Sequence, residues 1–324
     1  MRLLKLVPDN TNIGFLKWRH IAMAISMLSI IASIALVATK GLNLGVDFVG
    51  GQMVRVTFSQ PADLDELRGT ISAVVQGDAN IQQFGSPNDV SIRTPLPEGG
   101  EEAANEAAER LKAAILKAHP DAVFGSVDTV SGKVSGELFE TGAWAMFFAM
   151  LAISIYIWFR FEWQFGLGAL FALFHDVALT FGLFALTQME FNLNIVAALL
   201  TIIGYSLNDT IVIYDRIREN LRKYRKMELV PLLDLSINET LARTVMTSLT
   251  IIITLVVLLV LGPEVIFGFT AAMLFGIFVG TYSSMYMSAP LLVWTKVGSD
   301  SFIAKSGGPV PGAERVMQNE TMPR

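Results

Sequence analysis

The sequence contains no cysteine and unusually little charge. Without cysteine the chain can form no disulfide and has no thiol to offer as a nucleophile or metal ligand. Charged residues make up 16% of its 324 residues, whereas about a quarter is typical of soluble domains. Six apolar stretches contain only two acidic residues and no basic one, and they cover residues 21–39, 141–159, 165–187, 193–214, 245–261 and 267–292. These stretches exclude an ordinary soluble fold.

Each stretch has the length of a membrane-spanning helix. About 20 apolar residues carry a helix across a bilayer core of roughly 30 Å, so the sequence predicts an α-helical membrane protein with six transmembrane helices. The first stretch, 21–39, is longer than a signal-peptide core of about 7–15 residues and ends without an Ala-x-Ala site. It is predicted to be a signal anchor that stays in the protein.

Basic residues predict the orientation of these helices. They precede the first stretch, separate the second from the third, and follow the fourth and the sixth: Arg2, Lys5, Lys17, Arg19, Arg160, the run "RIRENLRKYRK" (216–226), Lys296, Lys305, Arg315 and Arg324. The short loops 188–192 and 262–265 contain none. Because basic residues favour the cytoplasmic side, residues 1–20, the loop 215–242 and the tail 295–324 are predicted to be cytoplasmic. We interpret run 216–226 as a topological signal, not as a nucleic-acid site.

Residues 40–140 form an acidic insertion on the outer side, between helices 21–39 and 141–159. Residues 41–140 contain 15 Asp and Glu against 7 Lys and Arg. Short alternating segments and helical segments follow one another in the order β-α-β-β-α-β: 52–58, 63–75, 80–84, 89–94, 98–120 and 122–131. This order predicts an α+β, ferredoxin-like domain. It contains no His, Cys or carboxylate cluster with ligand spacing, so no metal, cofactor or enzyme activity is predicted.

Asn208 and Asp209 interrupt the apolar stretch 193–214. Asp209 lies six residues before Asp215, where the chain is expected to leave the membrane, which puts it roughly 9 Å inside the helix end. An ionised Asp at the centre of a membrane helix costs about 3 kcal/mol. The next helix is expected to begin near Asn238, so Arg243 lies at a similar depth. The sequence therefore predicts an Asp209–Arg243 ion pair.

Hydroxyl side chains accompany this pair on both helices. Thr240, Thr244, Thr247 and Thr254 recur at helical spacing on one, and Tyr205, Ser206 and Asn208 lie less regularly on the other. We expect the two stripes to face each other and hold water. An Asp that alternates between pairing with Arg and binding a proton could couple proton transfer to helix movement.

His175 and Asp176 form a second titratable pair, near the midpoint of stretch 165–187. Buried Asp, Glu and His residues are the usual components of proton relays. Adjacent helical residues point about 100° apart, so we expect only one of the two, Asp176, to face Asp209. In stretch 267–292 a small residue recurs every four positions, which predicts close helix packing; these residues are Ala272, Gly276, Gly280, Ser284 and Ser288.

Six motifs in this order resemble the SecF family, the subunits that join SecD in the SecD–SecF complex of the bacterial Sec protein-export system. They are "LGVDFVGGQ" (44–52), "VSGKVSGEL" (130–138), "HD" (175–176), "SLNDTIVIYDRIREN" (206–220), "ARTVMTSLT" (242–250) and "GTYSSMYMSAPLL" (280–292). The resemblance extends from about Asn12 to Trp294. It implies a fold of the resistance-nodulation-division superfamily, with six helices here that are pseudo-symmetric with six from SecD.

The resemblance also implies a function. The family complex uses the proton-motive force to promote preprotein export across the inner membrane. Its partners are SecD, the SecYEG translocon, YajC and unfolded preprotein, and domain 40–140 would be periplasmic. Positions matching Asp209 and Arg243 are held essential for proton flow. Asp47, Gly50 and Gly51 would be structural, with the glycines allowing a sharp turn into the periplasmic domain.

Three other functions stay open on the residues alone. A small-molecule exporter of the same superfamily would normally contain two six-helix repeats, and this chain contains one. A membrane scaffold without proton coupling would need neither Asp209 nor Arg243. An intramembrane aspartyl protease would use Asp176 and Asp209, but the sequence lacks its Gly-x-Gly-Asp signature.

Overall fold

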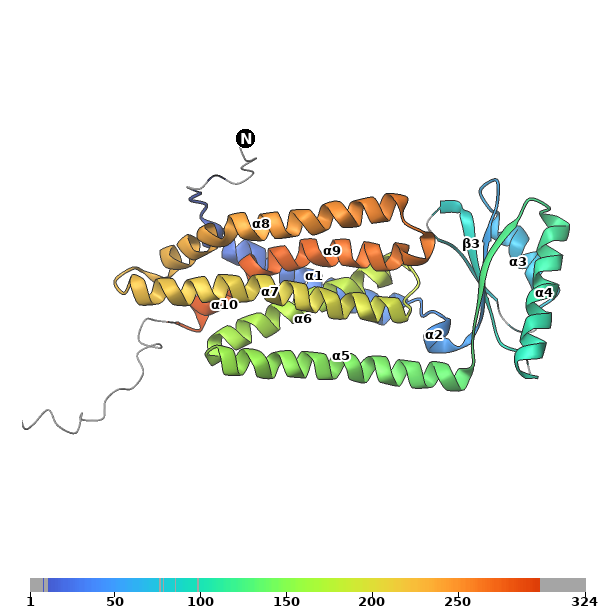
Figure 1. Cartoon of the computed structure of the whole chain (residues 1–324), viewed down its shortest axis with the longest axis horizontal. Coiled ribbons are helices and arrows are strands. Elements are labelled where there is room, and N and C mark those ends of the chain that lie inside the picture. Colours follow the sequence, from blue (N-terminus) through green and yellow to red (C-terminus); the bar gives the residue numbers. More distant parts are fainter. Residues whose placement is uncertain are drawn as a thin grey trace, which may run out of the picture.

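The structure, a computed structural model, consists of a helical bundle and a small sheet domain at one end of it (Figure 1). It describes residues 8, 11–75, 77, 79–84, 86–97 and 99–297; Arg2, Lys5 and the tail beyond 297 lie outside this part. Within it, six helical segments are long and apolar enough to cross a membrane. They are α1 (Arg19–Lys40), α5 (Gly132–Arg160), α6 (Trp163–Thr187), α7 (Leu193–Lys223), α8 (Leu229–Leu261) and α9 (Phe267–Ser283), which continues through a π-helical segment (Ser284–Ser288) into α10 (Ala289–Trp294).

Burial separates the centre of the bundle from its rim. More than half of the most apolar window is buried in α6 and α7 (56% each), against 17% in α8 and 11% in α5. The central helices therefore pack against protein, while α5 and α8 expose apolar side chains such as Phe147 and Val260. Such exposure is stable in lipid, where apolar side chains need no cover from water.

Three helices extend well beyond their apolar stretches. α5 already begins at Gly132, within the expected insertion 40–140. α7 continues to Lys223, and α8 already begins at Leu229. The prediction that α8 begins near Asn238 was therefore wrong. The reason is that apolar residues keep their helical spacing across the charged segment and are buried there: Ile217, Leu221, Leu232, Leu233 and Ile237. Of the expected loop 215–242, only a short turn around residues 224–228 is non-helical.

Small residues allow the central helices to approach closely. A Cβ atom on Gly276 would lie 2.8 Å from Cγ2 of Ile202 on α7, and one on Gly280 would lie 3.0 Å from Cβ of Ser206. All five members of the predicted small-residue face are buried. Because there is no room for a larger side chain, this face fixes α9 against α7.

The sheet domain lies between α1 and α5 in the chain. Its elements are β1 (Gly51–Thr57), α3 (Leu64–Ser72), β2 (Asn80–Phe84), β3 (Ser86–Thr94), α4 (Gly100–Ala118) and β4 (Val123–Val130). The strands are ordered β2-β3-β1-β4, and neighbouring strands are antiparallel.

Alternating side chains give this domain its own core. Val54 and Val56 of β1 and Val90 and Ile92 of β3 are fully buried, as is Ile115 of α4. Each fully buried side chain of this size stabilises the fold by about 1.5–3 kcal/mol. The domain therefore has a core separate from that of the bundle.

The connection between the two parts is hydrogen-bonded. The linker after α1 runs beside the loop between α6 and α7, where Leu44 and Phe191 form a parallel bridge. Gly45 N donates to Phe191 O at 2.9 Å and Phe191 N to Asn43 O at 2.7 Å. The short helix α2 (Val46–Val49) follows and leads into β1. The α6–α7 loop thus holds the linker that carries the sheet domain.

Candidate functional site

Asp209 lies on α7 at the interface with α8 and α9. Its residue surface is 2% exposed, and its Oδ2 is buried without a hydrogen-bond partner. The apolar spacing of α7 turns it inward, because Ile202, Ile213 and Ile217 on the same helix are also buried. A buried polar atom without a partner costs about 1–3 kcal/mol, and more when charged. The buried carboxyl of Asp209 therefore does not stabilise the fold of the chain alone.

Arg243 on α8 lies close enough for its charge to act on Asp209. The structure nevertheless contains no hydrogen bond or ion pair within 4.0 Å between these two described side chains, and Arg243 is exposed. The predicted direct pair is therefore wrong for this structure. The reason is the rotation of α8: it contacts α7 through Ser248, whose Oγ is 2.9 Å from the Tyr205 hydroxyl, and Arg243 lies about 140° around the helix from Ser248.

The two hydroxyl stripes face each other only in part. Thr240 and Thr244 are buried, and the side chain of Thr247 forms a hydrogen bond with Tyr205 of α7. Thr254 is exposed and donates to a carbonyl of its own helix at 3.0 Å. Asn208 is exposed. Of the four threonines predicted to face α7, Thr254 therefore turns away from it.

His175 and Asp176 form the best-connected polar cluster inside the bundle. His175 Nδ1 lies 2.9 Å from Asp176 Oδ1. Asp176 Oδ2 accepts from Ser206 Oγ of α7 at 2.5 Å and from Ser283 Oγ of α9 at 2.8 Å. His175 and Asp176 are at most 1% exposed. Asp176 thus faces α7 as expected, but it contacts Ser206, one turn before Asp209, and the structure gives it no direct contact with Asp209.

A second hydroxyl chain begins beside this cluster. Ser248 of α8 bonds to Tyr205 of α7 and lies 2.8 Å from Thr281 of α9. Sequence reasoning missed Ser248, Thr281 and Ser283. The sequence shows only that these three are hydroxyl residues inside apolar stretches. This does not distinguish a contact with another helix from a hydrogen bond to a carbonyl of the same helix. The π-helical segment, a feature often found at functional sites, starts directly after Ser283.

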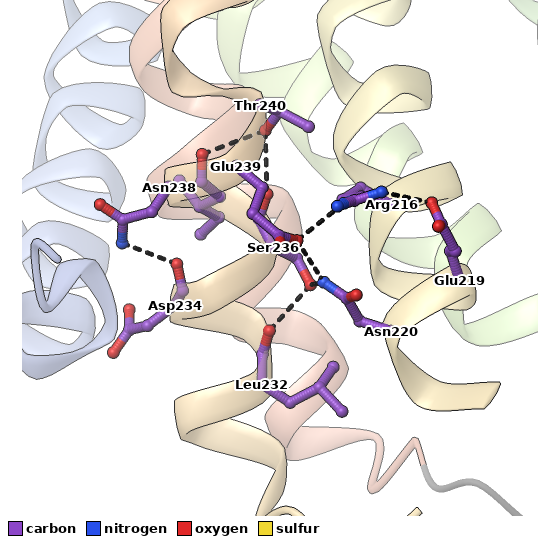
Figure 2. Close-up of polar contacts among 10 residues, drawn as sticks. Arg216, Glu219, Asn220, Leu232, Asp234, Ser236, Asn238, Glu239 and Thr240 are labelled. Carbon is purple, nitrogen blue, oxygen red and sulfur yellow. Dashed lines mark hydrogen bonds and ion pairs between the residues drawn. The ribbon is translucent and has the colours of Figure 1, made fainter. Parts of the chain in front are cut away.

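Polar contacts also connect α7 to α8 at the end that lies away from the sheet domain (Figure 2). Arg216 Nε donates to Glu239 at 2.7 Å, and Asn220 Nδ2 donates to Glu239 at 2.7 Å and to Ser236 at 3.0 Å. Arg216 also pairs with Glu219 on its own helix at 2.6 Å. This network fixes the two helix ends beyond Asp209 and Arg243.

Asp47, Gly50 and Gly51 lie where the linker enters the sheet domain. Asp47 Oδ2 accepts from the backbone N–H of Leu193, the first residue of α7, at 2.9 Å. A carboxylate there satisfies a free N–H group and interacts favourably with the helix dipole. Gly50 and Gly51 have φ angles of +75° and +114°, which L side chains rarely adopt. Asp47 therefore ties the linker to the helix that carries Asp209.

Two protein-family models match the chain over these residues. The model described as "SecD/SecF GG Motif" matches 35–62, which contains Asp47, Gly50 and Gly51. The model described as "Protein export membrane protein SecD/SecF, C-terminal" matches 110–298, more than half of the chain. The chain belongs to the SecD/SecF protein-export family.

Relatives of known name agree with this assignment to the SecD/SecF family. "Protein translocase subunit SecF" of Rickettsia felis is 42% identical over 89% of this chain and 94% of its own length. The SecF protein of Rhodobacter capsulatus is 42% identical over 90% of this chain and 91% of its own. The crystal structure of SecDF from Thermus thermophilus has a TM-score of 0.81 and 33% identity; it covers 89% of this chain, which spans 39% of that longer chain.

The second glycine of the family's GG motif allows a direct test. A Cβ atom on Gly51 would lie 2.7 Å from Thr94 O, a backbone atom of β3 that cannot swing away. We expect Gly51→Ala to destabilise the sheet domain by about 1–3 kcal/mol, because it adds both strain and overlap. Gly136→Ala is the control, since a Cβ there meets nothing within 4 Å. Protease resistance of the sheet domain measures the effect, and equal resistance of the two variants would contradict it.

Glu190 is a buried carboxyl at the junction of the two parts. The Oε1 atom of Glu190 lies in the space that Gly45, which has no side chain, leaves free. This oxygen has no hydrogen-bond partner. Burial raises the pKa of Glu190, an effect that nearby Arg55 and Arg93 oppose and nearby Asp47 and Asp128 reinforce. The folded state therefore binds the proton of Glu190 more tightly than the unfolded state does.

This difference predicts a pH dependence of stability. A carboxyl whose folded pKa is raised stabilises the fold below its unfolded pKa of 4.5, and that contribution is lost as the pH rises through the folded value. Stability should thus fall as the pH rises from 4.5 into the mildly acidic range, and Glu190→Gln should remove this part of the fall. Thermal unfolding in detergent as a function of pH measures it; identical profiles for variant and parent would contradict the assignment.

Within the residues that the structure describes, no group of three or more His, Cys, Asp or Glu residues gathers as a metal site would require. The polar residues of the bundle form cross-helix hydroxyl and carboxyl contacts.

Proposed function

We propose that this chain is the SecF-type subunit of a SecD–SecF complex that uses the proton-motive force to promote preprotein export through the Sec translocon. The observation that carries the proposal is Asp209, a buried carboxyl with one unpartnered oxygen beside the charge of Arg243. The names of the SecF relatives and of the solved SecDF support the export role. A small-molecule exporter is not favoured.

Asp209 would alternate between two states. Protonated, it is neutral and tolerates its apolar position between helices. Ionised, it attracts Arg243, which needs only a rotation or shift of α8 to meet it. One charge that crosses 100 mV of membrane potential contributes about 2.3 kcal/mol, and each pH unit of gradient adds about 1.4 kcal/mol. These energies suffice to shift a helix pair between two arrangements.

His175 and Asp176 would hold the proton at a second station. Asp176 reaches α7 through Ser206, which lies three residues before Asp209 on the same face. A change in the charge of either carboxyl therefore acts on the same turn of α7. Asn208 would extend the polar path toward the exposed side of that helix.

We expect SecD to bind the exposed polar face of α7 and α8. Arg243 and Asn208 are exposed in the chain alone, and at membrane depth such groups are costly unless another helix or water satisfies them. Helices from a partner would cover them. This chain spans 39% of the solved SecDF chain, so that longer chain contains further residues that could form the partner helices.

The topology completes the proposal. Residues 1–20, the α7–α8 connection within 215–242 and the tail 295–324 would be cytoplasmic, on the inner membrane of a bacterium. Segments 21–39 and 141–294 would provide the six spans. Residues 40–140, with their β-α-β-β-α-β order, would be a ferredoxin-like periplasmic domain that acts on unfolded preprotein as it leaves SecYEG, with YajC as a further partner.

Arg243→Met provides the test. It keeps a long side chain and removes the charge, so SecD should still copurify while the stimulation of export by a proton gradient falls to the level without a gradient. Arg225→Met is the control, because Arg225 lies in the α7–α8 turn. Normal stimulation in Arg243→Met would refute proton coupling through this site and favour a scaffold.

A further inference from the structure

A charged cavity lies between the end of α5 and the end of α7. Both helix ends lie at the end of the bundle away from the sheet domain (Figure 1). Its volume is about 640 Å³, and every side chain that lines it is charged. Four are basic and two acidic: Arg160, Arg218, Arg222, Lys223, Asp215 and Glu219. Arg160 is the last residue of a membrane-spanning helix, so the cavity lies at the membrane surface.

The acidic groups are largely engaged by arginines. Nη2 of Arg160 donates to both carboxylate oxygens of Asp215, at 2.8 and 3.0 Å. Glu219 pairs at 2.6 Å with Arg216, which does not line the cavity (Figure 2). Glu162, in the turn between α5 and α6, lies within reach of the charges of Arg218 and Arg222.

The basic groups outweigh these acids at this end of α7. The sequence 216–226 contains six Lys and Arg against one Glu, and Arg225 and Lys226 follow the cavity directly. Guanidinium groups match the geometry of phosphate oxygens. The cavity therefore suits an anion with several oxygens at its centre.

Exposed aromatic side chains lie at the same end of α5 and α6 as the cavity-lining Arg160. Trp158, Phe159 and Trp163 are 72%, 87% and 58% exposed, on the last turn of α5 and the first residue of α6. Tryptophan at such a position is typical of the membrane–water interface. α5 also exposes an apolar flank below it, including Ile155 and Leu151. Exposed aromatic and apolar side chains at this level are typical of a helix end that meets the membrane–water interface.

We propose that this cavity binds the phosphate headgroup of an anionic phospholipid. The inference rests on membrane insertion of the chain and not on proton coupling, so each can fail while the other stands. Basic residues at a helix end can act as a topological signal alone. The lipid proposal differs, because it assigns binding to Arg222 and Lys223, which line the cavity, and not to Arg225 and Lys226, which do not.

Tryptophan fluorescence of the full chain in vesicles tests the proposal. Trp18, Trp144 and Trp294 are replaced by Phe, which leaves Trp158 and Trp163 as reporters beside the cavity. Vesicles of phosphatidylcholine contain a small share of either brominated phosphatidylglycerol or brominated phosphatidylcholine as the quencher. The stronger quenching expected for phosphatidylglycerol gives its relative affinity for the cavity.

Two matched double variants separate the cavity from surface charge. Arg222→Gln with Lys223→Gln removes an Arg and a Lys that line the cavity, and should lower the relative affinity roughly tenfold or more. Arg225→Gln with Lys226→Gln removes the same charges just outside and should leave the preference largely intact. Equal loss in both variants, no preference in the parent, or binding of inorganic phosphate without a preference for brominated phosphatidylglycerol would overturn the proposal.

Discussion

We expect the replacement of Asp209 by asparagine to abolish the part of preprotein export that depends on a proton gradient. The amide has nearly the shape of the carboxyl but binds and releases no proton near neutral pH, so the coupling step is lost while the helices stay packed. Export by the complex should fall to the level without a gradient. Stability should not fall, because the unpartnered oxygen of Asp209 already costs the fold about 1–3 kcal/mol.

Asp215→Asn is the matched control. Asp215 lies six residues further along α7, where it is half-buried and paired with Arg160. The same chemical change there weakens two partly exposed ion pairs, with Arg160 and with Arg218. Each contributes about 0.2–1 kcal/mol, and gradient-dependent export should stay nearly unchanged. If Asp215→Asn reduced export as much as Asp209→Asn does, the effect would belong to helix α7 in general and not to the buried carboxyl.

Gly182→Leu prevents α1 and α6 from packing together. A Cβ atom on Gly182 would overlap the side chain of Ser33 and lie 3.0 Å from its Cα, which belongs to the backbone of α1. The clash cannot be relieved by a rotamer change, so the two helices must separate. We expect a loss of about 3 kcal/mol or more, seen as a lower midpoint of thermal unfolding in detergent and a lower yield of folded protein.

Two further variants isolate the cause. Gly136→Leu on α5 adds the same side chain where nothing lies within 4 Å and should leave the midpoint close to the parent's. Ser33→Gly removes the overlapping side chain and should restore part of the stability of Gly182→Leu. If Ser33→Gly gave no recovery, the contact between these two positions would not be the reason for the loss.

The membrane helices could be predicted from the sequence because lipid imposes one strong requirement, about 20 uncharged residues in a row. Their ends could not. α7 passes Asp215 and Arg216 without a break, because Ile217 and Leu221 still bury an apolar face and Arg216 pairs with Glu219 one turn on. Charge content alone predicts a loop at such a place.

The sequence indicates candidate residues for the site but not their contacts. Depth in the membrane follows from counting residues, so Asp209 and Arg243 could be placed at one level. The direction of Arg243 depends on the rotation of α8, which is set by the contact of Ser248 with Tyr205 and Thr281. Asp176 meets Ser283 across 107 residues of sequence, and no local pattern indicates that contact.

Helix α7 connects the sheet domain with the proposed proton site. Asp47 of the linker binds the first N–H of α7, and Asp209 lies 16 residues further along the same helix, about 24 Å away. A helix transmits a shift or rotation along its length, because its backbone hydrogen bonds keep it rigid. Movement caused by a change of charge at Asp209 can therefore reach the linker and the sheet domain it carries.

Proton flux through the purified complex in sealed vesicles tests this account most directly. An internal pH-sensitive dye reports acidification after a gradient is imposed, with the parent, Asp209→Asn and Asp215→Asn compared at equal protein content. The account predicts flux in the parent and in Asp215→Asn, and only the leak of empty vesicles in Asp209→Asn. Flux through Asp209→Asn at the parental rate would contradict it.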